Sequence, residues 1–518
     1  MADDDKSLLY KLKPVIDRMP AVSKPDGHVP FKTKMFWTTF ILVMYFIMTN
    51  VFIYGLDQEQ TLDLFASFRA ILAGAQGSIL HLGIGPIVTG SIIMQLFTGA
   101  KIIKLDLTDA EDKAIYQGTQ KVLVIIMIVV EAIPQVFGYL TPSTHLVDMI
   151  GTRGAQMIII VQLCIGSYLV FLMDELVSKW GMGSGISLFI AAGVAQQIFT
   201  GTVNWEASDP TAEIGFSTGQ GGQPNLPAGT IPRIIYVLTH LSSSDFTREG
   251  FRMVFIDPPN AIIALIGTIA VFIIVAYAES TRIELPLAHG KVRGARGRYP
   301  IRLVYASNIP VILMAALLAN IQMFALILWN SPRLEGTALG HNPLIGEYET
   351  GSTTPIGGFA FYVSQVNGVY HWLMPLLNDA YLPSYNTIYQ VLGHVIVYTS
   401  IMILGSIVFA KFWIETTNMG PEAVAKQIQS SGMQIPGFRR DPRVLKRVLE
   451  RYIPVVTVLS GAFVGALAAW ADLIGTTGNS SGTGVLLMVG IIIRMYEQIG
   501  KEQAMEMHPV LRGFFGAE

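Results

Sequence analysis

The chain has 518 residues, of which 51% are hydrophobic and 14% are charged. Soluble domains carry about 25% charged residues, so this composition excludes an ordinary soluble protein and predicts that lipid surrounds much of the chain. The net charge of −2 identifies no partner. The only cysteine, Cys164, lies in an apolar run, which excludes an intrachain disulfide and a cysteine-based metal cage and is typical of a small packing residue.

A polar tail, residues 1–34, precedes an apolar run that is too long for the core of a cleavable signal peptide. Ten apolar stretches are long enough to cross about 30 Å of hydrocarbon, and each predicts a transmembrane helix. They lie near 35–56, 80–100, 121–140, 154–173, 183–201, 258–278, 303–329, 386–410, 453–472 and 483–500.

The segment 57–76 is too polar to cross the membrane but carries an apolar helical face, which predicts a short re-entrant or interfacial helix. That face consists of Leu62, Leu64, Phe65, Phe68, Ile71 and Leu72.

The basic residues predict the orientation. With ten spans, 29 of the 35 Lys and Arg residues fall in the two terminal segments and in loops on the same side. The positive-inside rule therefore predicts a multi-pass protein of the cell membrane with both termini in the cytoplasm.

Ten spans divide into two halves of five, 35–205 and 250–518, joined by a polar outer connector, 206–249. Because five is odd, the second half starts on the opposite side of the membrane from the first. If both halves share a fold, they form an inverted repeat with a pathway at their interface.

Glycines and branched aliphatics occur together at the start of two predicted spans. The second contains Leu82–Gly90 (LGIGPIVTG), where Pro86 should interrupt or thin the helix, and the fifth begins at Gly181–Ile186 (GMGSGI). The i,i+4 pairs Ile84/Val88 and Ile186/Ile190 each share a helix face, as at a narrow hydrophobic constriction. Ordinary close packing of helices is the alternative.

Glu131 falls in the middle of the third span. A carboxylate at that depth costs about 2.5–3.5 kcal/mol on insertion scales, so it should face protein or water and indicates a functional seam. The alternative is a protonated or hydrogen-bonded packing residue. Asn308, Pro310 and Asn320 in the seventh span add polar groups and a kink.

Two loops on the cytoplasmic side are strongly basic. The loop 279–302 contains Lys291, Arg293, Arg296 and Arg298, and its glycine spacing predicts exposed, mobile arginines that suit RNA phosphates or anionic lipid headgroups. The loop 411–452 is long enough for a small folded protrusion. The alternative for the loop 279–302 is a plain topology signal.

The chain contains no phosphate loop, zinc helix or nucleophile elbow, and its histidines lack ligand spacing. We therefore expect no catalytic residues, no metal and no cofactor, and we expect partners or a gradient to supply the energy.

Several long motifs, in order, resemble the SecY/Sec61 alpha family of protein-translocation channels, in its archaeal and eukaryotic form. They are Leu82–Phe97, Met173–Val194, Ile283–Ile312, Phe412–Thr417 and Gly482–Gln498. The resemblance implies an all-α membrane protein with ten helices in two inverted halves around an hourglass pore, a re-entrant plug helix, and no enzymatic activity.

The resemblance also assigns roles to residues. It implies a pore ring of Ile84, Val88, Ile186, Ile190, Ile312 and Leu487. It places the plug within 57–76, and Thr89, Glu131 and Asn320 in a lateral gate. It matches Lys291, Arg293, Arg296, Arg298, Arg439 and Arg440 to ribosome-binding positions.

The partners that the resemblance implies are a SecE/gamma-type subunit and a small beta-type subunit in a heterotrimer, the ribosome with its rRNA, signal peptides, nascent chains and membrane lipid. The expected function is passage of unfolded secretory polypeptides and lateral release of transmembrane segments. A secondary transporter and a membrane-embedded hydrolase are the two other classes of function to test.

Overall fold

The structure is a computed structural model of the chain. It describes residues 8–27, 29–57, 72–99, 102–103, 105, 109–138, 140–208, 214–216, 224–242, 246–289, 296–302, 308–330, 337–338, 340–349, 354–378, 381–382, 386–417, 419–430, 433–434 and 442–507.

The fold is mostly helical, as expected for spans whose backbone groups must be satisfied within the segment itself. Across the described ranges, nine helices are long and apolar enough to cross a membrane. They lie within α2 (Phe31–Thr49), α4 (Ala110–Gly138), α5 (Thr144–Trp180), α6 (Gly185–Val203), α10 (Ile262–Ser280), α11 (Ile309–Asn330), α14 (Ile388–Thr416), α16 (Pro442–Ile474) and α17 (Gly482–Met507).

The remaining predicted span, the second, near 80–100, corresponds to α3 (Gly85–Gly99). Its 15 residues cover only about 22 Å at 1.5 Å per residue. The helix begins late because Gly83 adopts a left-handed backbone, with φ of 56°, and Pro86 is tolerated only in the first turn. The irregular residues before it are buried in protein, where Ile79 N donates to Val51 O at 2.8 Å and Ile84 N to Leu72 O at 2.7 Å.

The same pattern of helix packing occurs in both halves. In the first half α3 packs on α4, α4 on α5, α5 on α6, and α2 on α5 and α6. In the second half α11 packs on α14, α14 on α16, α16 on α17, and α10 on α16 and α17. The halves meet where α3 contacts α11 and α14, and where α6 contacts α17. Five spans in each half invert the repeat relative to the membrane.

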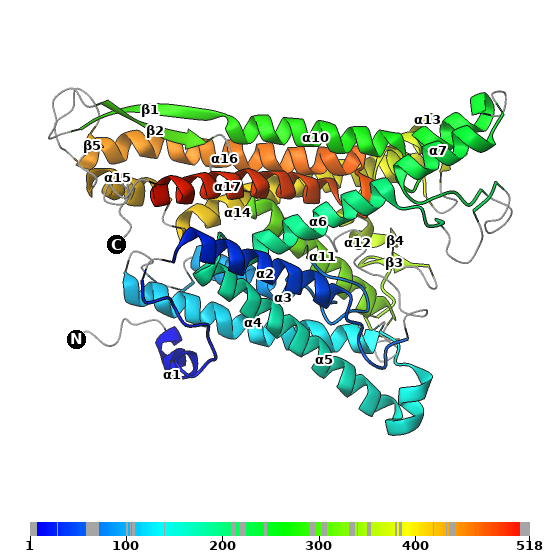
Figure 1. The fold of residues 1–518 in the computed structure, drawn as a ribbon, viewed down its shortest axis with the longest axis horizontal. Coiled ribbons are helices and arrows are strands. Elements are labelled where there is room, and N and C mark those ends of the chain that lie inside the picture. The colour runs from blue at the N-terminus through cyan, green and yellow to red at the C-terminus, as the bar shows by residue number, and fades with distance from the viewer. Residues whose placement is uncertain are drawn as a thin grey trace.

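Strands and short helices cap the two ends of the bundle (Figure 1). One end, which we call the basic end, carries β1 (Arg282–His289), β2 (Arg296–Arg302), β5 (Met433–Gln434), α15 (Pro421–Ser430), and η1 (Leu8–Leu12) with α1 (Lys13–Ile16). The opposite end carries α7 (Thr230–His240), β3 (Glu347–Tyr348), β4 (Pro355–Gly357), α12 (Gly358–Val363), α13 (Val369–Leu377), the π-helix Phe246–Gly250, α9 (Phe251–Phe255) and η5 (Thr477–Asn479).

The described part of the outer connector packs together with the following helix, α9, around a small apolar core. Leu226, Val237, Met253 and Val254 are buried together there. Arg233, only 4% exposed, donates from Nη1 to the carbonyl of Asp257 at 2.8 Å. Burial lowers the pKa of Arg233 to about 10, which leaves it charged at neutral pH. The connector is therefore a folded element that fixes the entry to α10, which its polar composition did not predict.

Candidate functional site

A central cavity of about 520 Å³ opens at the basic end of the bundle. Its polar mouth includes Lys113 and Gln117 near the start of α4, and Trp413 and Thr416 near the end of α14. Its wall includes the predicted ring residues Val88, Ile186 and Ile312, from α3, α6 and α11. The cavity therefore connects the basic end with an aliphatic surface to which both halves contribute.

All six predicted ring residues belong to, or pack against, the largest apolar cluster of the protein. Ile84, Val88, Ile190, Ile312 and Leu487 are buried, whereas Ile186 is half-buried and borders the cavity. Leu486 is buried as deeply as its neighbour Leu487, so burial does not distinguish these two positions. The structure thus places the six predicted side chains in or against the apolar core that spans both halves, and it brings three of them, Val88, Ile186 and Ile312, to one cavity.

The predicted seam residues lie where α3 and α4 of the first half face α11 of the second. Asn320 Nδ2 donates to Thr89 Oγ1 at 3.0 Å, which links α11 to α3 across the interface. Thr89 Oγ1 also donates to the carbonyl of Gly85 at 3.0 Å. Glu131 is 4% exposed and lines a small cavity with Asn320, so its carboxylate faces protein, as its cost in lipid predicts.

Sequence reasoning missed two polar residues at this seam. His81 and Gln135 line the same cavity of about 10 Å³, which has room for about one water molecule. His81 Nδ1 accepts a hydrogen bond from the backbone N–H of Gly77 at 3.1 Å. Gln135 lies one helical turn after Glu131, and this i,i+4 spacing is a signal that marks a shared face.

The predicted plug is described only at its end. Leu72 lines the small seam cavity, and its carbonyl accepts the N–H of the ring residue Ile84 at 2.7 Å. The other five predicted plug residues lie outside the described residues; they are Leu62, Leu64, Phe65, Phe68 and Ile71.

The described residues of the basic loop 279–302 form the two strands of a β-hairpin, which the sequence pattern did not predict, and Arg296 and Arg298 lie in β2. Strand β1 pairs antiparallel with β2, from Arg282 opposite Arg302 to Ala288 opposite Arg296. Alternation of branched residues such as Ile283, Leu285 and Leu287 with other residue types favours such a ribbon over an irregular loop.

The two basic loops form one three-stranded sheet, because β5 pairs with the end of β1. The expected folded protrusion in 411–452 consists, in its described part, of β5, α15 and the start of α16. Lys291, Arg293, Arg439 and Arg440 lie outside the described residues.

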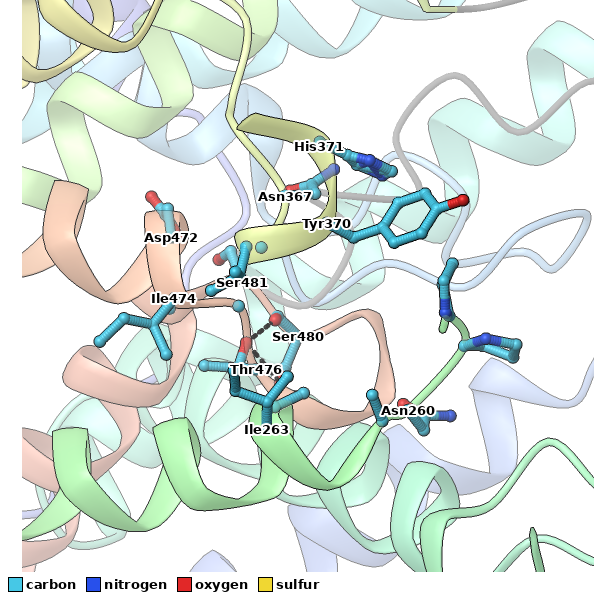
Figure 2. A pocket seen from close by; sticks show the side chains of 18 of the residues that line it. Asn260, Ile263, Asn367, Tyr370, His371, Asp472, Ile474, Thr476, Ser480 and Ser481 are labelled. Carbon is cyan, nitrogen blue, oxygen red and sulfur yellow. Dashed lines mark hydrogen bonds between the residues drawn. The ribbon is translucent and has the colours of Figure 1, made fainter. Parts of the chain in front are cut away.

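A second cavity, of about 330 Å³, lies at the opposite end, where α10, α13 and α17 begin (Figure 2). Its lining is rich in hydroxyls and amides, and Tyr370 and His371 on α13 lie across from Thr476 and Ser480. Among the described residues that line this cavity, Asp472 carries the one carboxylate, and both of its oxygens have partners within the protein. It accepts hydrogen bonds from Gln365 Nε2 at 2.7 Å, Tyr398 Oη at 2.6 Å, Thr483 N at 3.0 Å and Thr483 Oγ1 at 2.9 Å. No predicted site residue lies there.

Comparison with known proteins identifies the family to which this architecture belongs. The family model described as SecY matches residues 78–496, and the model described as the plug domain of Sec61p matches residues 43–77. The chain belongs to the SecY family.

Two archaeal relatives of this SecY-family chain are named protein translocase subunit SecY. The Haloferax volcanii protein is 46% identical over 514 residues, covering 98% of this chain and 99% of the relative. The Archaeoglobus fulgidus protein is 44% identical over 521 residues, covering 99% of each. These names favour a channel over the secondary transporter and the membrane hydrolase that the sequence left to test.

Two solved structures are similar over nearly the whole chain. One is described as a protein-conducting channel, with a TM-score of 0.75, 39% identity, and coverage of 96% of this chain and 98% of that one. The other, Sec61 in the canine ribosome-channel complex from the endoplasmic reticulum, has a TM-score of 0.73 with the same identity and coverage. The helical fold predicted from the sequence is therefore confirmed.

Proposed function

We propose a mechanism by which this protein-conducting channel subunit of the SecY family passes polypeptides across the membrane. The observation that carries the proposal is the central cavity, which is polar at its mouth and ends on aliphatic side chains that both halves contribute. The protein lies in the cell membrane with its basic end on the cytoplasmic side. An extended polypeptide enters from this end. The ring of Ile84, Val88, Ile186, Ile190, Ile312 and Leu487 closes around it. Aliphatic side chains offer ions no substitute for their hydration shell, so the ring excludes ions by dewetting.

The plug, 57–76, closes the resting channel on the outer side of the ring. Its described end supports this role, because Leu72 is bonded to the backbone of Ile84 and reaches the seam cavity. Displacement of the plug would therefore disturb the ring and the seam together.

The seam of Thr89, Glu131 and Asn320 acts as the lateral gate. A hydrogen bond of 3.0 Å between Asn320 and Thr89 links its two sides, and the Glu131 carboxylate is buried beside it, away from lipid. A signal peptide or nascent span opens it, because each CH₂ group that moves from water into lipid contributes about 0.8 kcal/mol. The chain itself catalyses no covalent step, and partners supply the energy.

The sheet of β1, β2 and β5 docks the translating ribosome. Arg296 and Arg298 of β2 and Arg439 and Arg440 of the segment after β5 supply guanidinium groups, which suit the phosphates of rRNA. A SecE/gamma-type subunit and a small beta-type subunit complete a heterotrimer, with lipid around it.

Conductance of the resting channel tests the ring. Replacing Ile84, Ile186 and Ile312 with glycine removes their side chains from the closed aperture and should raise the resting ion conductance in planar bilayers. The matched control replaces Ile266, Ile269 and Ile273 of α10, whose side chains are exposed on the surface of the chain, with glycine and should leave the conductance low. Equal conductance for the two triple variants would remove the support for the ring.

A further inference from the structure

The two stems of the basic hairpin converge on α17. Glu279, on the last turn of α10, leads into β1, and Asn308 immediately precedes α11 after β2. Glu279 is 2% exposed and Asn308 is 4% exposed. Arg494 on α17 donates from Nη2 to Glu279 Oε1 at 3.3 Å. An ion pair with one fully buried partner therefore fixes the first stem to the last span.

Gly490 on α17 lies between the two stems. A Cβ atom at this position would be 3.0 Å from Glu279 Oε1 and would overlap Asn308 Nδ2. Both side chains therefore pack directly on the backbone of α17, which is possible only because residue 490 has no side chain. A second ion pair, Arg282 Nη2 to Glu497 Oε1 at 2.8 Å, extends the attachment into β1.

The contact is tight but incompletely hydrogen-bonded. Within the described chain, the second carboxylate oxygen of Glu279, Oε2, and the amide nitrogen of Asn308, Nδ2, are buried and have no hydrogen-bond partner. Buried polar atoms without partners are unfavourable, so this arrangement depends on the packing around it. A displacement of the hairpin that lets water reach these atoms would relieve that cost.

Two ring residues lie about one helical turn from this contact. Asn308 is four residues before Ile312 on the α11 side, and Gly490 is three residues after Leu487 on α17. A helical turn is rigid over 5.4 Å, so the positions of residues 308 and 490 constrain those two ring residues.

We propose that Glu279, Asn308 and Arg494 are positioning residues that clamp both hairpin stems onto α17 and thereby hold the α11 and α17 sides of the ring closed. The clamp rests on the proposed function, because it connects the docking hairpin to the ring. A partner that pulls on the sheet releases the clamp and loosens the ring. The clamp would make docking and opening a single event without any contact between the partner and the pore.

The test measures resting conductance of the purified channel with its partner subunits in planar bilayers. Arg494→Gln removes the charge, and Gly490→Ala displaces Asn308 without removing any charge. Arg494→Gln should raise the open fraction of resting channels about tenfold, which corresponds to about 1.4 kcal/mol and is typical of a lost hydrogen bond to a charged group. Gly490→Ala should raise the open fraction as well, because the added Cβ atom overlaps Asn308 Nδ2 and forces that side chain away from α17. Arg494→Lys keeps the charge, so its resting conductance should be much closer to that of the parent than to that of Arg494→Gln.

Glu502→Gln is the matched control. It breaks another ion pair of α17, with Lys34 of α2 at 2.6 Å, without touching the hairpin. It should leave the conductance at the parent level, and thermal unfolding of all variants identifies any that lose the fold. If the control conducts as much as Arg494→Gln, α17 has loosened generally and the clamp is wrong. Parent-like conductance in both clamp variants, with unchanged melting, overturns it as well.

Added ribosomes separate the clamp from the docking role. If ribosomes bind the parent and raise its conductance, and add nothing further to Arg494→Gln, the hairpin and the clamp act in series as proposed. If the clamp variants conduct but ribosomes bind neither protein, the clamp stands and the docking assignment fails. A parent channel that conducts freely at rest overturns both the ring and the clamp.

Discussion

The hydrogen bond between Asn320 and Thr89 should set how hydrophobic a segment must be to open the lateral gate. Asn320→Ala removes this 3.0 Å bond between α11 and α3. Thr89 is not orphaned by the change, because its hydroxyl still donates to the carbonyl of Gly85 at 3.0 Å. The loss is therefore the net value of one hydrogen bond, about 1 kcal/mol, which shifts the equilibrium toward the open gate about fivefold.

One buried CH₂ group contributes about 0.8 kcal/mol, so the variant should accept a segment that is less apolar by about one methylene. A series of nascent chains with leucines replaced stepwise by valine, tested for membrane insertion in proteoliposomes, measures this threshold. Asn330→Ala is the matched control, because Asn330 is an exposed asparagine on the same helix. A threshold that is unchanged, or that moves toward more apolar segments, would refute the role of this bond.

Three further changes test other parts of the structure. Arg439→Glu with Arg440→Glu should weaken ribosome binding, most strongly at low salt where charges are least screened, and normal binding at all salt concentrations would contradict the assignment. Asp472→Ala should destabilise the fold by at least about 3 kcal/mol, because several buried donors lose their acceptor; an unchanged melting temperature in detergent would contradict this. Lys446 donates to Glu422 at 3.0 Å and holds the pKa of that carboxyl below its usual range. The contact should therefore stabilise α15 at neutral pH and be lost as the pH falls through this lowered pKa. Hydrogen exchange in α15 should be slower in the parent than in Lys446→Ala at neutral pH, and the two proteins should exchange alike in acid; a difference that persists in acid would contradict this.

The sequence predicted the helices well because lipid leaves the backbone few alternatives. Their ends were harder to predict. The second span was expected from residue 80, but Gly83 and Pro86 delay α3 to Gly85. The fourth was expected near 154–173, yet α5 extends over Thr144–Trp180, with two helical segments that meet at a kink where the backbone of Gly151 is non-helical.

The candidate site was predicted only in part, because contacts between residues far apart in the chain leave no local sequence pattern. Glu131 stood out because a carboxylate at membrane depth is costly, and the motifs pointed to Thr89 and Asn320. The clamp at Glu279 joins residues more than 200 positions apart in the chain, and no local pattern marks such a contact. The hairpin was not predicted, because glycines and arginines such as those in its sequence are also typical of irregular loops.

The path of the polypeptide is the central claim, and a photocrosslink tests it most directly. A photoreactive residue at position 186 or 312, in channels that hold a stalled nascent chain, should crosslink to the part of the chain that is passing the membrane. The same probe at Ile273, on the exposed face of α10, should give no product with a polar chain. Crosslinks at position 273 and none at 186 or 312 would show that the chain crosses elsewhere.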